Sequence, residues 1–403
     1  MQGPIELIRS DSIKEYENLG PIYEWVDGAT YLLIDAVIFR NTRGVIFCYN
    51  NPPVHQISNP GITAYVKGIK KVFEQRNYFK FLILYGANDP VHAGGDLKES
   101  LSKIDRTLVL RREKEASSAS PEEIDQLYNW AENDRLKIGI AFYNIMRKLS
   151  QNMRLVAVCG GGIRFGGSAE IPLMADILVG DSRSSMCWSE AMIGLISGWA
   201  GVARTLTKAG FINAKYVMEL SKEIKADELK EIGIYNIVVD IPFSFPEMPK
   251  TGNREADKAQ YHEELQKHND MTGLILLPKG LEFAICPQEE IPAVKEEERK
   301  FLATEEEISL EVTGRKDPNT YKDLWGKRLR EVKKEIAELG KPLAPQSIEA
   351  LERLFEGYDP STFDEKLFAE QAMYADAKLY RDPRLRAGLT ARLEQRVADF
   401  RLS

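Results

Sequence analysis

Two glutamates lie twenty residues apart in the most apolar and glycine-rich part of the chain, Glu170 in FGGSAEIPL and Glu190 in CWSEAMIGL. An ionised carboxylate is costly to bury without a partner, so acids in such a setting need an explanation. Two carboxyl groups that face one substrate can serve as a general acid and a general base. The alternative is that each acid only caps or pairs at a helix start, and the two residues alone leave this open.

Two glycine-rich turns accompany these acids. The first, in LYGANDPVHAGGDLKES, contains Gly94 and Gly95 followed by Asp96, and the second has five glycines between Gly160 and Gly167. Glycine lets a ligand approach main-chain N–H groups closely, and two such groups aimed at a carbonyl oxygen form an oxyanion hole. The alternatives are tight turns alone or loops that hold a phosphate. Neither segment has the GxGxxG or Gly-Lys-Ser/Thr spacing of nucleotide-binding loops, which weakens the phosphate alternative.

Alternating strands and helices must hold these turns in place. Apolar runs at residues 79–86, 154–161 and 176–181 indicate buried strands, and residues 62–77 and 136–152 carry apolar side chains at helical spacing. This alternation predicts an α/β fold with a parallel sheet covered by helices. Each glycine turn then follows a strand and precedes a helix, where backbone N–H groups have no partner within the helix.

The composition divides the chain into three predicted parts. Residues 1–242 carry the alternating pattern and are expected to form the core of the fold. Residues 243–335 are punctuated by proline and strongly charged, which indicates an insertion or small subdomain. Residues 336–403 form a helical C-terminal region. Its apolar stripes exceed what so short a tail can bury by itself, so we expect subunit contacts there.

Charge and composition exclude several classes of function. The chain has 403 residues and a net charge of -7, and it contains no block of basic residues. Binding to nucleic acids or anionic membranes needs a positively charged face, so neither partner is expected. The sequence has no run of eighteen apolar residues and no secretory signal pattern, so we expect a soluble, cytoplasmic protein. The four cysteines and four histidines lack the spacing of a metal site, so no metal is expected.

Taken together, these motifs resemble the crotonase, or enoyl-CoA hydratase/isomerase, superfamily. VHAGGDLKE is similar to the first oxyanion segment of that family, and FGGSAEIPLMADILVG is similar to the second. SEAMIGLISGWAGVARTLTKAG resembles the stretch with the second catalytic glutamate, and ADELKEIGIYNIVVDIP resembles the helix and strand after it. RAGLTARLEQRVADF resembles the closing helix. The resemblance covers residues 30–242 and 340–403.

The resemblance implies a crotonase-like spiral of ββα repeats, with a C-terminal helical region that joins subunits into homo-trimers or homo-hexamers. It also implies an acyl-CoA thioester as substrate, with coenzyme A as part of the substrate and no separate cofactor. By position, the N–H groups of Gly95 and Gly167 would form the oxyanion hole. Glu170 and Glu190 would be the two catalytic acids, at the spacing found in the family's hydratases.

The same resemblance places residues around coenzyme A. The backbone at Ala93, Asp96 and Leu97, next to Gly95, would line the adenine pocket. Lys98 would help to neutralise the phosphates of coenzyme A, unless it is simply an exposed helix lysine. The family has a small residue where this chain has Trp199, and the indole either walls a pocket for a ring or branched acyl group or fills the core.

The two glutamates together favour the addition of water to the double bond of a 2-enoyl-CoA thioester, with a cyclic or branched acyl group as one option. The predicted enzyme is an enoyl-CoA hydratase-like hydro-lyase of fatty or aromatic acid degradation. A crotonase-type hydrolase, which opens a ring ketone or cleaves the thioester, would use the same oxyanion hole. An enoyl-CoA isomerase and a non-catalytic assembly module are further alternatives.

Overall fold

A computed structural model describes residues 16–26, 29–39, 43–49, 51 and 54–401 of the chain. The chain forms two compact units, and each unit is assembled from three separate stretches. Unit 1 comprises Met1–Gly94, Asn144–Met186 and Ile224–Arg299, and unit 2 comprises Gly95–Tyr143, Cys187–Glu223 and Lys300–Ser403. The boundaries at residues 242 and 335 that composition suggests stay a prediction.

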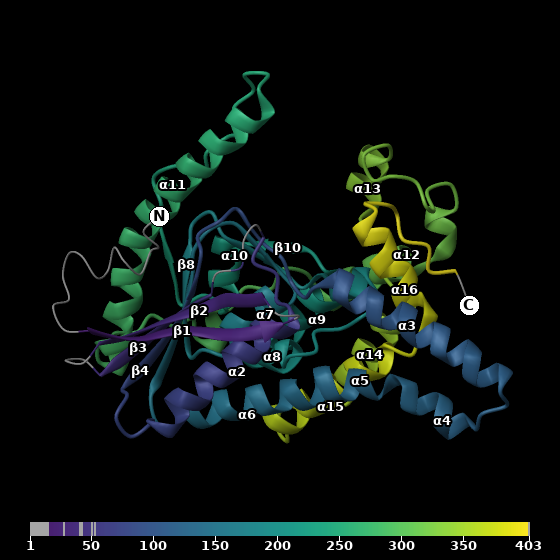
Figure 1. Cartoon of the computed structure of the whole chain (residues 1–403), viewed down its shortest axis with the longest axis horizontal. Helices are drawn as coiled ribbons and strands as arrows, with labels where there is room; N and C mark the ends of the chain where they lie inside the picture. Colours follow the sequence, from purple (N-terminus) through teal and green to yellow (C-terminus); the bar gives the residue numbers. More distant parts are fainter. Residues whose placement is uncertain (1–15, 27–28, 40–42, 50, 52–53, 402–403) are drawn as a thin grey trace. The chain divides into compact units, whose positions relative to one another are not determined.

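Unit 1 is built on a seven-stranded sheet in the order β1-β2-β3-β4-β6-β8-β11 (Figure 1). The antiparallel part consists of β1 (Tyr16–Val26), β2 (Ala29–Phe39) and β3 (Gly44–Tyr49). The parallel part continues from β3 through β4 (Phe81–Gly86), β6 (Arg154–Cys159), β8 (Ile177–Asp181) and β11 (Ile237–Val239). The three predicted strands are therefore confirmed, and so is the predicted α/β fold.

A smaller sheet carries the two glycine turns. Its order is β10-β9-β7-β5, with β5 (Val91–His92), β7 (Ile163–Phe165), β9 (Ser185–Cys187) and β10 (Glu223–Lys225). β5 and β7 pair in parallel, with His92 opposite Arg164. Because the carboxyl ends of parallel neighbours lie at the same edge of a sheet, the turns that follow β5 and β7 begin side by side.

One helix of unit 1 begins at a serine cap. α2 (Asn59–Glu74) follows the N-cap residue Ser58, whose hydroxyl accepts a hydrogen bond from the Gly61 N–H at 3.3 Å. It confirms the helix predicted near residues 62–77. The predicted helix at 136–152 is also present, as α6 (Ile138–Ser150). Among the described residues, the remaining helices of unit 1 are α7 (Gly167–Leu173), α10 (Ala226–Glu231), α11 (Arg254–Ile285) and the single turns η4 (Gln288–Glu290) and η5 (Glu296–Glu298).

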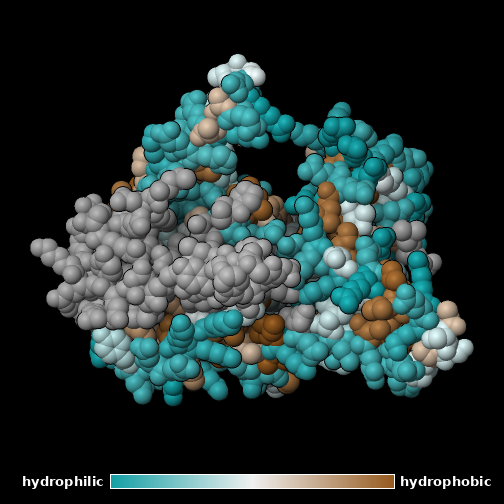
Figure 2. Space-filling model, viewed as in Figure 1, coloured by the Kyte–Doolittle hydropathy of each residue, from teal (hydrophilic) through white to brown (hydrophobic). Residues whose placement is uncertain are grey.

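The C-terminal half of α11 packs on the sheet although it belongs to the charged stretch of the sequence. Leu276 and Leu277 are buried in one hydrophobic cluster with Val156 and Val158 of β6. The helix can approach this closely because Gly280 has no side chain, since a Cβ there would lie 2.5 Å from a methyl carbon of Val158. The other half of α11 stands away from the sheet, and Figure 2 shows mostly hydrophilic side chains over it. Part of the predicted insertion is thus core.

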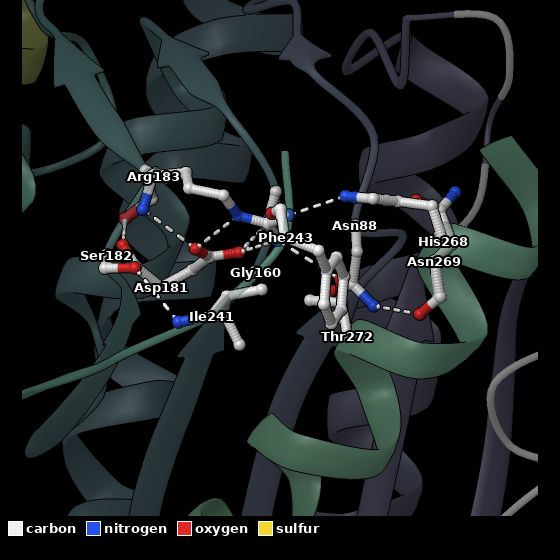
Figure 3. A network of polar contacts seen from close by, with 12 residues as sticks. Asn88, Gly160, Asp181, Ser182, Arg183, Ile241, Phe243, His268, Asn269 and Thr272 are labelled. Carbon is white, nitrogen blue, oxygen red and sulfur yellow. Dashed lines mark hydrogen bonds and ion pairs between the residues drawn. The ribbon is translucent and has the colours of Figure 1, made fainter. Parts of the chain in front are cut away.

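A polar network fastens α11 to the end of β8 (Figure 3). The guanidinium of Arg183 donates to both carboxylate oxygens of the fully buried Asp181, at 2.9 and 2.5 Å. It also donates to the Thr272 hydroxyl of α11 at 3.1 Å and to the Phe243 carbonyl at 2.9 Å. Its contact with His268 Nε2 requires that nitrogen to accept, because an arginine has no acceptor. Burial lowers the pKa of His268, which favours the neutral ring that this contact needs.

Replacing Arg183 with methionine is expected to destabilise the fold by about 3–5 kcal/mol, the usual effect of leaving a buried charge without its partner. Asp181 is 0% exposed, so its carboxylate could not turn to water. Urea unfolding followed by circular dichroism measures the loss. The double variant Asp181→Asn/Arg183→Met should lose less, since no unpaired charge remains. An Arg183→Met variant as stable as the wild type would mean that the network is not what holds α11.

Unit 2 is mainly helical. Ser120 caps the start of α4, where its hydroxyl and the Glu123 side chain form a capping box. The last helix, α16, ends at Leu393, before the left-handed Gln395 at φ 54°. The elements of unit 2 are α3 (Leu97–Ala116), α4 (Pro121–Asp125), η1 (Gln126–Tyr128), α5 (Asn129–Ala131), η2 (Glu132–Lys137), η3 (Ser189–Met192), α8 (Gly201–Ala209), α9 (Phe211–Leu220), α12 (Glu305–Lys316), η6 (Pro318–Tyr321), α13 (Lys333–Leu339), α14 (Pro345–Glu356), α15 (Glu365–Leu379) and α16 (Pro383–Leu393).

Candidate active site

The second glycine turn places Glu170 in a buried helix. Gly166 adopts φ 49° and ψ -124°, which favours glycine, and α7 begins at Gly167. Glu170 lies in the first turn of α7 and is only 3% exposed. Carboxylates near a helix N-terminus interact favourably with the unpaired N–H groups there. The structure therefore holds Glu170 on a short buried helix directly after the glycines.

Three glycines of the second turn serve packing. A Cβ at Gly160 would lie 1.9 Å from Asn88 Oδ1, and one at Gly162 would lie 2.0 Å from the Pro90 carbonyl. Gly161 has φ +91° and faces the Asp89 carbonyl. The backbone of residues 88–90 thus lies directly against residues 160–162, and no side chain fits between them. This supports the tight-turn interpretation for these three positions, while Gly166 and Gly167 belong to the turn before Glu170.

The two glycine turns contact each other within unit 1. A Cβ at Gly94 would come to 2.9 Å from the Phe165 carbonyl and 3.4 Å from the Gly167 nitrogen. The Ser168 hydroxyl donates to the Ala93 carbonyl at 2.5 Å. Ser168 lies inside α7, and this hydrogen bond ties the first turn to the second. The residue before Gly95 is therefore packed on the residue proposed to supply the second oxyanion donor.

The start of α3 is held by the aspartate of the first turn. Asp96 is the N-cap residue, and its Oδ1 accepts from the N–H groups of Lys98 and Glu99, both at 3.0 Å. Leu97 is half-buried and Lys98 is exposed. Gly95 and Asp96 are half-buried, so their backbones are partly accessible. Contact of these residues with coenzyme A stays a prediction.

Glu190 and Trp199 lie in unit 2. Glu190 is in η3, and its backbone carbonyl accepts from the N–H groups of Ile193, Gly194 and Leu195 at 3.0 to 3.1 Å. Trp199 is 6% exposed. Glu170 belongs to unit 1 and Glu190 to unit 2, so the pairing of the two acids on one substrate stays a prediction.

Trp199 packs among side chains of unit 2. The guanidinium of Arg135 lies 5.9 Å from the indole ring, and the Phe142 ring lies 6.1 Å away. Both are contacts of a buried aromatic side chain, which favours the core interpretation of Trp199 over that of a pocket wall.

A buried acid that the sequence interpretation missed stands near Trp199. Asp376 of α15 is 1% exposed and lies 3.9 Å from Arg135. A Cβ at Gly198 would lie 2.2 Å from its Oδ2, so the carboxyl packs directly on the bend before Trp199. Burial raises the pKa of Asp376 to about 6, while Arg135 lowers it. An aspartate within the apolar stripe of EKLFAEQAMYADAKLY was the available signal.

The Asp376→Asn substitution is expected to change how stability depends on pH. The folded pKa lies above that of the unfolded chain, so the stabilising contribution is complete below about pH 4 and is lost as pH rises through about 6. The variant lacks this loss, so its unfolding free energy relative to wild type should rise by about 3 kcal/mol across that window. Unfolding at a series of pH values measures the difference, and parallel curves for the two proteins would contradict the assignment.

Two features are absent from the described residues, a cluster of metal ligands and a membrane-spanning helix. Within them, no group of three or more His, Cys, Asp or Glu side chains could hold a metal ion. No helix in the same residues is long and apolar enough to cross a membrane.

Comparison with known proteins agrees with the resemblance seen in the sequence. Residues 118–241 match the family described as enoyl-CoA hydratase/isomerase. The matched segment includes Gly167, Glu170, Glu190 and Trp199.

Curated relatives match over part of their length. A short-chain-enoyl-CoA hydratase of Clostridium acetobutylicum is 27% identical over 133 residues, which are 33% of this chain and 51% of that protein. A crotonyl-CoA hydratase of Syntrophomonas wolfei is 24% identical over 160 residues, 40% of this chain and 62% of that protein. The chain thus aligns with between half and two thirds of these two relatives.

The fold has a solved counterpart. An enoyl-CoA hydratase from Rhodobacter sphaeroides superposes with a TM-score of 0.50 at 11% identity, covering 87% of each chain. At this identity the likeness concerns the fold alone.

Proposed function

We propose that this chain is a hydro-lyase that adds water to the double bond of a 2-enoyl-CoA thioester, because residues 118–241 match the family described as enoyl-CoA hydratase/isomerase. The observation that carries the proposal is the order of functional residues inside the matched segment, with Gly167 three residues before Glu170 and Glu190 twenty residues further on. The packing of Gly94 on Gly167 supports it, because the two oxyanion turns must converge.

In the proposed reaction, the thioester oxygen accepts hydrogen bonds from the N–H groups of Gly95 and Gly167. Negative charge grows on this oxygen as the enolate forms, so fixed donors stabilise the transition state more than the ground state. Gly167 is the first residue of α7, where the N–H has no partner inside the helix. The helix dipole adds a favourable field at this end.

In this reaction one glutamate acts as the general base and the other as the general acid. Glu170, as the base, takes a proton from the water that attacks the β carbon, and Glu190, as the acid, delivers a proton to the α carbon. One carboxyl must be ionised and the other protonated, which burial and nearby like charges can arrange. After one turnover Glu170 is protonated and Glu190 is ionised, so one proton must pass from Glu170 to Glu190, by way of solvent, before the next cycle.

The proposal extends to coenzyme A binding, to the place where the protein acts and to its assembly. The backbone at Ala93, Gly95, Asp96 and Leu97 binds the coenzyme A part of the substrate. The reaction needs no separate cofactor. The protein acts in the cytoplasm on intermediates of fatty or aromatic acid degradation. It assembles through its C-terminal helices into trimers or hexamers, which light scattering of the purified protein measures.

Incubation of the purified protein with straight, branched and cyclic 2-enoyl-CoA esters tests the proposal. Hydration removes the conjugation between the double bond and the thioester, so ultraviolet absorbance should fall and the reaction should reverse from the 3-hydroxyacyl-CoA side. Release of free coenzyme A or of a new carboxylate would favour the hydrolase, and an unchanged product mass would favour the isomerase. Failure to bind any acyl-CoA would favour the non-catalytic module.

A further inference from the structure

A small cavity in unit 1 lies beside the second glycine turn. Its volume is about 40 Å³, enough for a few waters, since one water needs roughly 10–15 Å³. Its wall includes Ile57, His92, Arg164 and, from α7, Ser168. Ile57 also lies against Gly167, where a Cβ would come to 3.7 Å from its Cγ1. Glu170 is not among the residues that line the cavity.

Two polar side chains of the cavity wall each have a buried nitrogen atom that no other described group satisfies. His92 and Arg164 are paired across β5 and β7, so they project to the same face. They are 2% and 6% exposed. Among the residues that the structure describes, neither His92 Nε2 nor Arg164 Nε has a hydrogen-bond partner. Unsatisfied buried nitrogens in a cavity with room for an occupant indicate that something polar fills it.

The charge of Arg164 decides what kind of occupant fits. Its guanidinium donates to the Gly160 carbonyl at 2.7 Å, and within the described residues it forms no ion pair with a carboxylate. A buried cation without an opposite charge is costly. A neutral occupant would accept hydrogen bonds from Arg164 but would leave its charge uncompensated. An anion both accepts these hydrogen bonds and compensates the positive charge.

His92 adds a proton-dependent second contact. The His92 imidazole donates to the Asp89 backbone carbonyl, which leaves Nε2 as the ring nitrogen without a partner among the described residues. Burial and the neighbouring Arg164 and His55 lower the pKa of His92 well below its usual value, so the ring is neutral while the cavity lacks negative charge. A negative occupant reverses the electrostatic part of this effect.

The other titratable groups around the cavity are already engaged. His55 accepts from the Asn51 N–H through Nδ1 at 3.1 Å, and its Nε2 contacts the Asp89 carboxylate. Asn269 of α11 donates to the other Asp89 oxygen at 2.6 Å, so this carboxylate is held outside the cavity wall. The Tyr49 hydroxyl donates to the Gln56 carbonyl, and burial raises its pKa. The remaining hydroxyls of the wall come from Tyr65, Tyr85 and Ser168.

We propose that this cavity binds one small monovalent anion, of the size of chloride or bromide, between Arg164 and a protonated His92. Binding takes up one proton, because Nε2 must donate to the anion and Nδ1 keeps its hydrogen bond to Asp89. The volume excludes the phosphates of coenzyme A and any large carboxylate. The anion sits behind Ser168 and Ile57, so it stabilises the turn that carries Gly167 without touching substrate.

Halide titration of the wild-type protein tests the proposal without any activity measurement. The melting temperature is followed as bromide replaces gluconate, which is too large to enter, at constant ionic strength. The expected result is a saturable rise, with halide affinity increasing by up to about tenfold for each pH unit of acidification because one proton is taken up per anion. Sulfate should not compete, because of its size.

Variants separate the two contacts. Arg164→Gln should abolish the halide effect, and His92→Gln should keep the effect but lose its pH dependence, since an amide donates at every pH. Lys267→Met, which removes an exposed charge from the same unit, is the matched control and should behave as wild type. If Arg164→Gln does not fold, wild-type crystals grown with bromide decide through an anomalous peak within hydrogen-bond distance of Arg164. No saturable halide effect and no such peak would overturn the proposal and leave water as the occupant.

Discussion

The Glu170→Gln variant should hydrate crotonyl-CoA about 10²- to 10⁴-fold more slowly than wild type, because positioned acid–base groups contribute that much to the catalytic rate. It should still bind acyl-CoA. The amide has nearly the same shape as the carboxyl, so the short helix α7, in which Glu170 is 3% exposed, should keep its packing. Glu190→Gln should have an effect of similar size, since a hydration needs both proton transfers. The rate is measured from the absorbance of the conjugated thioester, and binding from calorimetry with a saturated acyl-CoA.

The chain provides a matched control for this experiment. Glu219 of α9 is also 3% exposed, and burial raises its pKa to about 7, yet it has no place in the proposed reaction. Glu219→Gln should therefore keep the activity of wild type. A Glu170→Gln variant that hydrates as fast as Glu219→Gln would remove Glu170 from the mechanism, whatever the identity of the enzyme.

Gly167→Pro should lower kcat by about 10²- to 10³-fold, because it removes the N–H proposed to bind the thioester oxygen. Proline is best tolerated at the first position of a helix, and Gly167 is the first residue of α7. The binding of substrate in the ground state should change less than kcat, since the hydrogen bond strengthens only as charge develops on the oxygen.

Gly167→Ala separates the loss of the N–H from the addition of carbon atoms. A Cβ at this position would lie 3.7 Å from Ile57 Cγ1, which is ordinary contact, so alanine should fit and keep most of the activity. Melting temperatures of both variants show whether they fold. Equal activity of folded Gly167→Pro and Gly167→Ala would mean that this N–H does not stabilise the transition state.

The strands and the glycine turns could be predicted because their signals are local. The apolar runs that became β4, β6 and β8 are each bounded by glycine or a polar residue, and Ser120 carries its capping partner three residues further on. Local signals of this kind are consistent with the fold that forms.

The partners of α11 could not be predicted because they come from distant parts of the sequence. Asn269 reaches Asp89 and Asn88 across about 180 residues, and Arg183 reaches Thr272. Charge and proline along residues 243–335 indicated an insertion or small subdomain, whereas a minority of apolar residues on one side of α11 was enough to join the core. The pairing of His92 with Arg164 could not be predicted for the same reason, because it depends on the register of β5 and β7.

The most direct test of the central claim is hydration of crotonyl-CoA by the purified protein in heavy-oxygen water, with products read by mass spectrometry. We expect an intact 3-hydroxyacyl-CoA that carries one heavy oxygen on its acyl chain. The Glu170→Gln variant should fail to form this product, and the Glu219→Gln variant should form it as wild type does. Heavy oxygen in a released free acid, or no incorporation while crotonyl-CoA binds, would contradict the account.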